Sequence, residues 1–329
     1  MLILQKGRDR TESIDYYRSL ASLAISGNVD KVRSALDPKA KSEMLSYLPK
    51  SLDIWDKSLA DFARIERSTG SQYRLNEKTK TYAIDAIAVS NAFGMQTEKL
   101  DFAFKAFSIY YLSVHLLDDL MEDPKKFYSK FTYKDEESKE RRIRASGASF
   151  IYSSGLTVHN ILESQNKSNP ETLLRTETSM SESLARMIKY FNIKNQILAP
   201  EKVIEVKNRE VSGEATAFFL EFARLQDSSK RKINQHVRQS LVYLGSLTQF
   251  TDDLRDLEED RKDKNINLII ALRGLYGKNA SNEWAKLYQR EEQNMLRAIE
   301  KSRIDTDINL LKVIPWYPFF AKDKIKGLA

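Results

Sequence analysis

Carboxylates stand at helical spacing in two short stretches of the chain, residues 115–123 and 249–260. In the second stretch, Asp252, Asp256 and Asp260 are four residues apart, so a helix would place them on one face. Like charges at that spacing destabilise an isolated helix by roughly 0.2–0.5 kcal/mol per pair. A bound cation would remove this repulsion, and Mg²⁺ takes a few carboxylate ligands and fills its other positions with water and phosphate oxygens. The spacing therefore predicts a divalent-cation site.

The first stretch repeats this pattern. Asp118 and Glu122 are four residues apart, as are Asp119 and Asp123. His115 lies one turn before Asp118 and could hydrogen-bond a carboxylate or a phosphate, although a lone histidine beside an apolar face is more often an ordinary core residue. If the two stretches face each other, they form an anionic mouth for several Mg²⁺ ions, and those ions would hold a diphosphate.

Three further polar residues belong to the second stretch. Asp253 lies three residues before Asp256, Gln249 lies three before Asp252, and Arg255 lies among the acids. The alternative interpretation is a solvated, charged helix face, which is what most charge runs are. Here the apolar segment LVYLGSLTQF directly precedes the acids on the same predicted helix, so we expect them at the mouth of a buried segment.

The elements that must position these residues are predicted to be helices. Apolar residues recur at intervals of three and four in segments such as LDFAFKAFSIYYLSVHLL, ATAFFLEFARL and VRQSLVYLGSLTQF. Only 11 glycines and 7 prolines occur in 329 residues, which disfavours an all-β fold rich in tight turns. We therefore predict an all-α fold, with a single domain spanning residues 1–329 and about ten helices around a central core. The helices within residues 1–100 precede the first acidic stretch.

Composition disfavours several other kinds of protein. The absence of cysteine rules out disulfides, thiolate metal sites and a cysteine nucleophile, and it fits a reducing cytosol. The net charge of +7 is spread along the sequence rather than gathered in a basic stripe, so we expect no nucleic-acid partner. The 3 histidines lack the paired spacing of a zinc site. With no signal-peptide core at the N-terminus and no apolar run near the roughly 20 residues of a spanning helix, we expect a soluble, cytoplasmic protein.

Residues 313–329 form an unusual tail. The apolar and aromatic segment VIPWYPFF, residues 313–320, precedes Lys322, Lys324 and Lys326. We interpret it as a segment that docks on the core. Peripheral contact with a membrane surface is the alternative.

The string GSLTQFTDDLRDLEED, residues 245–260, resembles the second motif of the squalene/phytoene synthase family, which runs G-x-x-x-Q-x-T-N-x-x-R-D-x-x-E-D. The residues that match in register are Gly245, Gln249, Thr251, Arg255, Asp256, Glu259 and Asp260. The first stretch is similar to that family's first motif at Asp119, Glu122 and Asp123, and equally similar to the DDxxD of chain-elongating prenyl diphosphate synthases. These enzymes share the class I isoprenoid synthase fold, so the resemblance implies an all-α bundle around one deep cavity.

Several positions depart from the family pattern. Asp252 stands where the family usually has Asn, which gives a DDxxD like that of the chain elongators. Lys207 falls where a Tyr would be expected, and His115 falls where an Arg would be expected. The chain elongators' GKRxRP start, and the RRG that follows their first motif, are absent. These departures weaken the prediction of head-to-head condensation more than the resemblance to the superfamily.

The resemblance implies roles for particular residues. The implied metal ligands are Asp118, Asp119, Glu122, Asp123, Asp252, Asp253, Asp256 and Asp260. Catalytic roles are implied for Asp118, Asp119, Gln249, Asp252, Arg255 and Asp256. We expect diphosphate oxygens to be bound by His115, Lys207, Arg209 and Arg255. Tyr111 and Phe219 are candidates for the cavity wall, with ordinary core packing as their alternative role.

The implied activity is a Mg²⁺-dependent, head-to-head condensation of two prenyl diphosphates such as farnesyl or geranylgeranyl diphosphate, with about three Mg²⁺ ions around the diphosphate. Terpene cyclisation and head-to-tail elongation are alternatives, and a catalytically inactive scaffold homologue is a further one. No dinucleotide fingerprint is visible, and the family's NADPH-using members also lack one, so the use of NADPH stays open. The sequence does not predict the oligomeric state.

Overall fold

The computed structural model describes residues 8–69, 72–73, 82–95, 97, 100–122, 131–132, 197–225 and 234–320, and scattered positions between 155 and 196. The first helices are α1 (Arg8–Ile25), α2 (Val29–Ala35), α3 (Pro38–Ser46), α4 (Leu48–Thr69), α5 (Tyr82–Ala92) and α6 (Asp101–Glu122). The later elements are α10 (Pro200–Val203), the π-helix η3 (Ile204–Gly213), α11 (Glu214–Leu225), α12 (Gln235–Arg255), α13 (Leu257–Asp263), α14 (Leu268–Tyr276), the 3₁₀-helix η4 (Gly277–Asn279), α15 (Ala280–Ser302), α16 (Ile308–Val313), the 3₁₀-helix η5 (Ile314–Trp316) and α17 (Tyr317–Phe320). Strands β1 (Gln72–Tyr73) and β2 (Phe131–Thr132) form a short antiparallel pair. The predicted all-α fold is confirmed.

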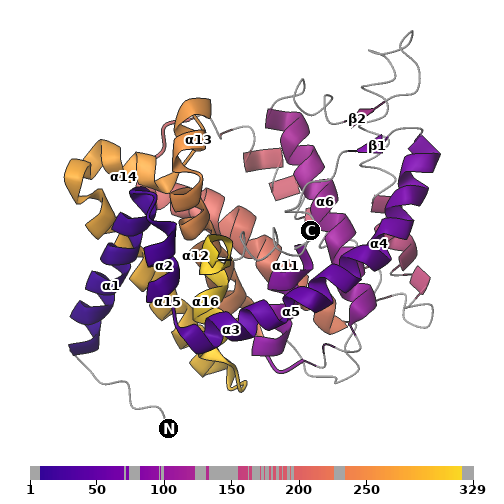
Figure 1. The fold of residues 1–329 in the computed structure, drawn as a ribbon, viewed down its shortest axis with the longest axis horizontal. Helices are drawn as coiled ribbons and strands as arrows, with labels where there is room; N and C mark the ends of the chain where they lie inside the picture. The colour runs from indigo at the N-terminus through magenta and orange to yellow at the C-terminus, as the bar shows by residue number, and fades with distance from the viewer. Residues whose placement is uncertain are drawn as a thin grey trace.

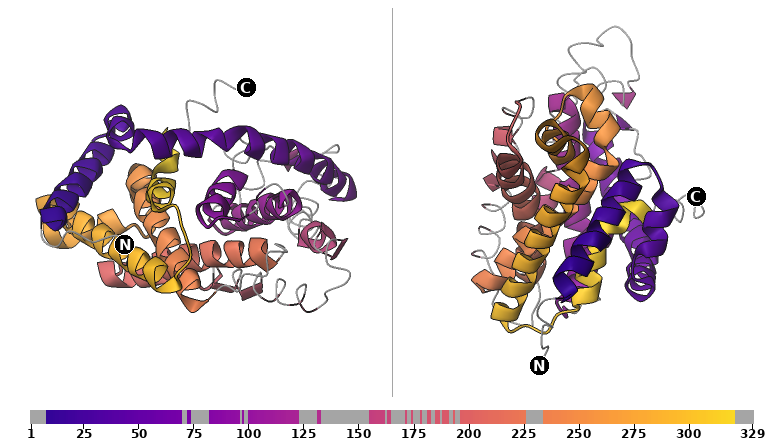
Figure 2. Two further views of the ribbon diagram at one scale, coloured as in Figure 1. Left: turned by 90° about the horizontal axis from the view of Figure 1, so that it is seen from below. Right: turned by 90° about the vertical axis from the view of Figure 1, so that its left-hand side faces the viewer.

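Helix α12 lies at the centre of the helical assembly and packs against α15, η3, α11, α14, η5 and α1 (Figure 1). Helices α1 to α4 run along one side of the molecule, where they cover the later helices (Figure 2, left). Helices α4, α5 and α6 pack against one another, and α11 links this group to α12. The helix that carries the second acidic stretch is therefore enclosed by elements from both halves of the chain.

Side-chain caps mark where several helices begin. The Asn234 side chain accepts hydrogen bonds from the first amides of α12, and Asn267 does the same for α14. Asp307 accepts from the Leu310 amide at the start of α16. Asn and Asp at these positions satisfy backbone donors that have no partner within the helix.

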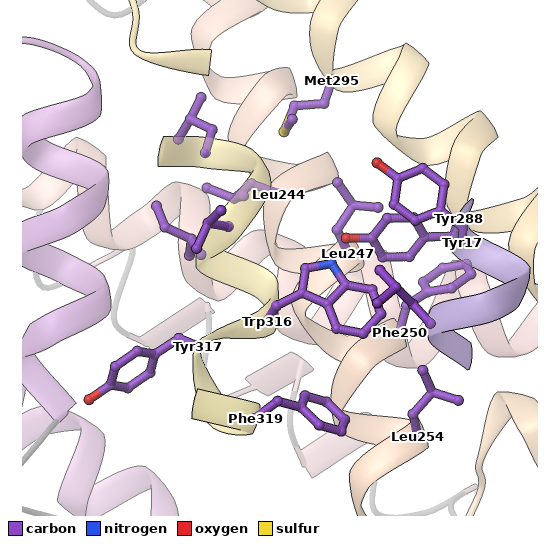
Figure 3. Packing of buried hydrophobic residues seen from close by; sticks show 14 of the residues in the cluster. Tyr17, Leu244, Leu247, Phe250, Leu254, Tyr288, Met295, Trp316, Tyr317 and Phe319 are labelled. Atoms are coloured by element: carbon purple, nitrogen blue, oxygen red, sulfur yellow. The ribbon is translucent and has the colours of Figure 1, made fainter. Parts of the chain in front are cut away.

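Two clusters of buried apolar residues form the core. The larger one joins α1, α12, α15 and the C-terminal segment, and Trp284 is among its aromatic members. Phe250, Tyr288 and Trp316 of the same cluster are labelled in Figure 3. The Trp284 and Tyr288 rings stack with centroids 4.9 Å apart, and Phe250 and Trp316 meet Trp284 edge-on. At one edge of this cluster, the Tyr17 hydroxyl of α1 donates to the buried Glu292 carboxylate of α15. The smaller cluster joins α4, α5, α6 and α11.

Two glycines allow η3 and α12 to cross closely. A Cβ atom added at Gly213 would lie 2.6 Å from the Val242 carbonyl oxygen, and one added at Gly245 would lie 2.5 Å from the Ser212 carbonyl oxygen. The Ser212 hydroxyl also donates to the Gly245 carbonyl at 3.0 Å. Any larger residue at either glycine would push the two helices apart, because backbone atoms cannot give way as a flexible side chain can.

The docked interpretation of the tail is confirmed for residues 313–317 and for Phe319, which are buried. The Thr251 hydroxyl of α12 donates to the Pro315 carbonyl, so the tail is bonded directly to the helix of the second acidic stretch. Residues 321–329, which include the three lysines, lie outside the described part. In that part, no helix combines the length and the apolarity needed to cross a bilayer.

We expect Trp316→Ala to lower the free energy of unfolding by about 3–5 kcal/mol, because it removes a fully buried indole from the centre of the larger cluster. Urea denaturation followed by circular dichroism measures this change. Tyr276→Ala is the matched control, since Tyr276 is 43% exposed and its removal should change the free energy by less than about 0.5 kcal/mol. Equal effects of the two substitutions would contradict the docked position of the tail.

Candidate functional site

The second acidic stretch is not one continuous helix. Helix α12 ends at Arg255, Asp256 leaves the helical conformation with φ −96° and ψ 11°, and α13 begins at Leu257. The Asp260 amide still donates to the Asp256 carbonyl at 2.9 Å. The predicted single row of acids is therefore divided between two helices, with the break at Asp256.

Arg255 joins two acids of the stretch. Its guanidinium donates to both Asp256 oxygens, at 2.8 and 2.7 Å, and also pairs with the Asp252 carboxylate. These three side chains are each about a third exposed, at 31%, 31% and 35% respectively. Partial desolvation of the carboxylate by the surrounding protein raises the pKa of Asp252 to about 6, although Arg255 acts in the opposite direction. Asp252 and Asp256 thus form an accessible carboxylate pair that carries its own counter-ion, and we call it the acid pair.

Asp253 has a different environment from the acid pair, although it lies between its two members. The carboxylate is fully buried, and its Oδ1 accepts from Lys207 at 2.7 Å and from Gln249 at 2.9 Å. Its Oδ2 accepts from the Leu268 amide at 2.7 Å, at the start of α14. The structure therefore brings the expected site residues Gln249, Lys207 and Asp253 together. Lys207 and Gln249 donate hydrogen bonds to Asp253 there.

Asp260 and Arg209 also have partners within the protein. The Asp260 Oδ2 accepts from Asn267 at 2.8 Å, and burial raises its pKa. The Arg209 guanidinium donates to both oxygens of the fully buried Glu291 on α15, and it lies 5.4 Å from the Tyr243 ring centre. Arg209 could bind a diphosphate only by leaving the Glu291 carboxylate without its cation.

One residue on the helix of the first acidic stretch lies within electrostatic range of Arg255. Tyr111 on α6 is 41% exposed. Burial acts to lower the pKa of Arg255, but the acid pair raises it, and Tyr111 adds to this increase. Helix α6 continues from Tyr111 through the first acidic stretch to Glu122, and its last turns lie at the same end of the molecule as α13 (Figure 1). The end of α6 and helix α13, which carries part of the second acidic stretch, therefore lie on the same side of the molecule.

Some expected site residues fall outside the described part of the structure. For His115, Asp118, Asp119 and Glu122, only the helical backbone within α6 is described, and Phe219 in α11 is likewise described without its side chain. Asp123 lies wholly outside the described residues. Their roles stay predictions.

Asp85 on α5 is a candidate site residue that sequence reasoning missed. Its Oδ1 atom is buried without a hydrogen-bond partner, and burial raises the carboxyl pKa to about 7, although nearby Arg255 acts to lower it. The sequence signal was a single acid within the otherwise small and apolar segment AIDAIAVS. Such a residue on a predicted core helix needs a partner or a function, because an unpaired carboxylate is costly to bury.

The donor set fits a divalent cation such as Mg²⁺. Within the described ranges, no group of three or more acids or histidines is close enough to hold a metal by itself. Mg²⁺ does not need such a group, because it usually takes one or two carboxylates together with phosphate oxygens of a substrate. The acid pair supplies two accessible carboxylates, and Asp85 supplies a buried oxygen that lacks a partner.

Comparison with known proteins gives a match at the level of the fold. No protein-family model and no curated protein sequence matches the chain. A geranylgeranyl pyrophosphate synthetase from the archaeon Geoglobus acetivorans matches with a TM-score of 0.57 and 15% identity, over 84% of this chain and 99% of that one. The chain has the isoprenoid synthase fold. This confirms the predicted fold class, and at 15% identity the likeness concerns the fold alone.

Two further solved structures are more distant. An isoprenoid synthase family member from Thermotoga neapolitana has a TM-score of 0.48 and 15% identity, over 82% of this chain and 96% of that one. A geranyltranstransferase from Thermotoga maritima has a TM-score of 0.43 and 15% identity, over 84% of this chain and 99% of that one.

We expect Asp85→Asn to flatten the pH dependence of stability. The folded-state pKa of Asp85 is raised from 3.8 to about 7, so its contribution to stability is fully present at low pH and is lost as the pH rises through this interval. The wild-type melting temperature should therefore fall between about pH 5 and about pH 8 by more than that of Asp85→Asn. Thermal melts at the two pH values measure the difference. Asp53→Asn removes an exposed carboxylate as a control, and a wild-type fall no larger than that of Asp85→Asn would contradict the expectation.

Proposed function

We propose that this protein is a Mg²⁺-dependent prenyltransferase that ionises an allylic prenyl diphosphate and transfers the prenyl group to an acceptor. One observation carries the proposal: Arg255, which joins the acid pair at the end of α12, lies within electrostatic range of Tyr111 on α6, the helix that bears the other acidic stretch. The isoprenoid synthase fold supports the proposal, because Geoglobus acetivorans uses it in a protein named for prenyl diphosphate synthesis.

The residues at the site suit the departure of a diphosphate. Mg²⁺ ions, when bound, would neutralise the diphosphate and stabilise it as a leaving group. Asp252 and Asp256, together with acids of α6, would hold those ions. Arg255 can exchange its carboxylate partners for diphosphate oxygens, to which a guanidinium donates two parallel hydrogen bonds. The allylic C–O bond breaks with its electron pair on the diphosphate, and the ring of Tyr111, as part of the cavity wall, would stabilise the positive charge that remains.

Among prenyl transfers, we favour head-to-tail condensation with isopentenyl diphosphate. The double bond of this acceptor attacks the allylic cation, and the new cation then loses a proton to give a product lengthened by five carbons. The Geoglobus acetivorans protein supports this choice, since its name describes a product of head-to-tail condensation. Head-to-head condensation is the second candidate, because Arg255, Asp256, Glu259 and Asp260 match the R-D-x-x-E-D of the squalene/phytoene synthase motif.

Product analysis separates these reactions. The purified protein is incubated with Mg²⁺ and dimethylallyl, geranyl, farnesyl or geranylgeranyl diphosphate, with and without isopentenyl diphosphate and NADPH. Released diphosphate is followed enzymatically, and products are identified by mass spectrometry. Products longer by five-carbon steps support the proposal, a product with twice the donor's carbon number supports head-to-head condensation, and an unchanged carbon number indicates cyclisation. The absence of diphosphate release from every donor would contradict an enzymatic function.

We expect Asp256→Asn to lower the rate of diphosphate release at least about a thousandfold, because it removes a metal-binding carboxylate and one partner of Arg255. The matched control is Glu258→Gln, two residues away in the same acidic stretch. The Glu258 side chain is 79% exposed, so this substitution should leave the rate within about twofold of wild type. If both variants turned over at the wild-type rate, the acid pair would not be part of the active site.

A further inference from the structure

Three elements meet at the buried Asp253 carboxylate. Lys207 reaches it from η3, Asp253 itself lies on α12, and the Leu268 amide that binds its Oδ2 begins α14. The Asn267 side chain donates to the Asp253 carbonyl at 2.8 Å and caps α14 through the Ile269 and Ile270 amides. We call Lys207, Asp253 and Asn267 the clamp.

Three protein donors bind the two oxygens of Asp253, and the side chain has no exposed surface through which a metal ion could reach it. Oδ1 has two donors and Oδ2 has one, all between 2.7 and 2.9 Å. The side chain is 0% exposed, whereas Asp252 and Asp256 on either side of it are each about a third exposed. The start of α14 adds its favourable dipole to the Lys207 charge, so the buried carboxylate is fully compensated within the protein.

Lys207 is equally committed to the clamp. Its Nζ donates to Asp253 and to the Ile266 carbonyl, both at 2.7 Å, and it lies 3.9 Å from an Asp260 oxygen. Burial alone would lower the Lys207 pKa, but Asp253 and its other neighbours raise it above the usual value, so the ammonium stays charged. Lys207 could reach a diphosphate only by leaving a fully buried carboxylate unpaired, which is strongly unfavourable.

The close helix crossing explains how Lys207 reaches Asp253. Gly213 and Gly245 hold η3 and α12 in near backbone contact. Lys207 lies within the π-helix before this crossing, and Asp253 lies two turns of α12 after Gly245. Single π-turns are rare and often occur at functional sites. Here the π-helix places Lys207 against the inner side of the acidic stretch.

We propose that Lys207 and Asp253 are positioning residues that hold α12 against η3 and the start of α14, and thereby keep Asp252 and Asp256 together beside Arg255. Neither residue binds the metal ion or the diphosphate. The acidic stretch is thus divided by function: the two accessible carboxylates bind the cation, and the buried one between them fixes their position. That the bound group is a metal ion with a diphosphate rests on the proposed function. The structural role of Lys207 and Asp253 does not depend on it.

The test compares Lys207→Met, Asp253→Asn and the double variant. Melting temperatures are measured in EDTA, and binding of Mn²⁺ with inorganic pyrophosphate is measured by titration calorimetry. Lys207→Met leaves Asp253 buried without its cation, so we expect the lowest melting temperature and about a tenfold loss of affinity. Adding Asp253→Asn removes the unpaired charge, so the double variant should melt higher than Lys207→Met and bind more tightly.

The decisive result is tighter binding by the double variant than by Lys207→Met, because it would show that removing the Asp253 carboxylate improves metal binding. If Asp253 were a metal ligand, the double variant would bind no better than the weaker single variant, and the proposal would be overturned. The matched control compares Asp256→Asn alone with Asp256→Asn combined with Lys207→Met. In that background, adding Lys207→Met should lower the affinity for Mn²⁺ with pyrophosphate further. If Lys207→Met fails to fold, recovery of a folded, binding-competent protein in the double variant gives the same answer.

The two proposals fail in different ways. If wild type does not bind Mn²⁺ with pyrophosphate, the proposed function fails, while the order of melting temperatures still tests the clamp. If wild type binds but Asp253→Asn leaves the melting temperature unchanged in EDTA, the clamp fails and the proposed function stands.

Discussion

The buried ion pair between Lys207 and Asp253 is the interaction on which the candidate site depends. A carboxylate without solvent exposure is tolerated only when donors surround it, and three protein donors do so here. Because these donors come from η3, α12 and α14, their need to converge on one group fixes the relative position of three elements. The position of α12 in turn determines where the side chains of the acid pair lie.

Helix periodicity and tertiary packing together divide the acids of the second stretch. Consecutive residues on a helix point about 100° apart, so Asp252 and Asp253 cannot share an environment. Asp252 is accessible and depends on Arg255, whereas Asp253 is buried and depends on Lys207. Arg255 compensates the acid pair in the absence of a bound cation, which lets the protein keep carboxylates close together without a permanent loss of stability.

The sequence was sufficient for the helices, the acid spacing and the docked tail, because each is encoded in local patterns of apolar and charged residues. It could not reveal the role of Asp253, since its partner Lys207 lies 46 residues away and nothing local indicates which of two adjacent acids is buried. Asp85 escaped notice because its importance comes only from burial near Arg255. The break at Asp256 was missed because four-residue spacing suits either one helix or two successive ones.

The contact between Tyr17 and Glu292 joins residues that are 275 positions apart, and the tail residue Trp316 packs in the same cluster. During synthesis, α1 therefore leaves the ribosome long before its packing partners exist. The apolar face of α1 must wait for α15, and the larger cluster cannot close before residues 313–319 have emerged. Folding of this half of the molecule consequently waits until residues 313–319 have been synthesised, and until then the nascent chain would expose apolar surface that chaperones recognise.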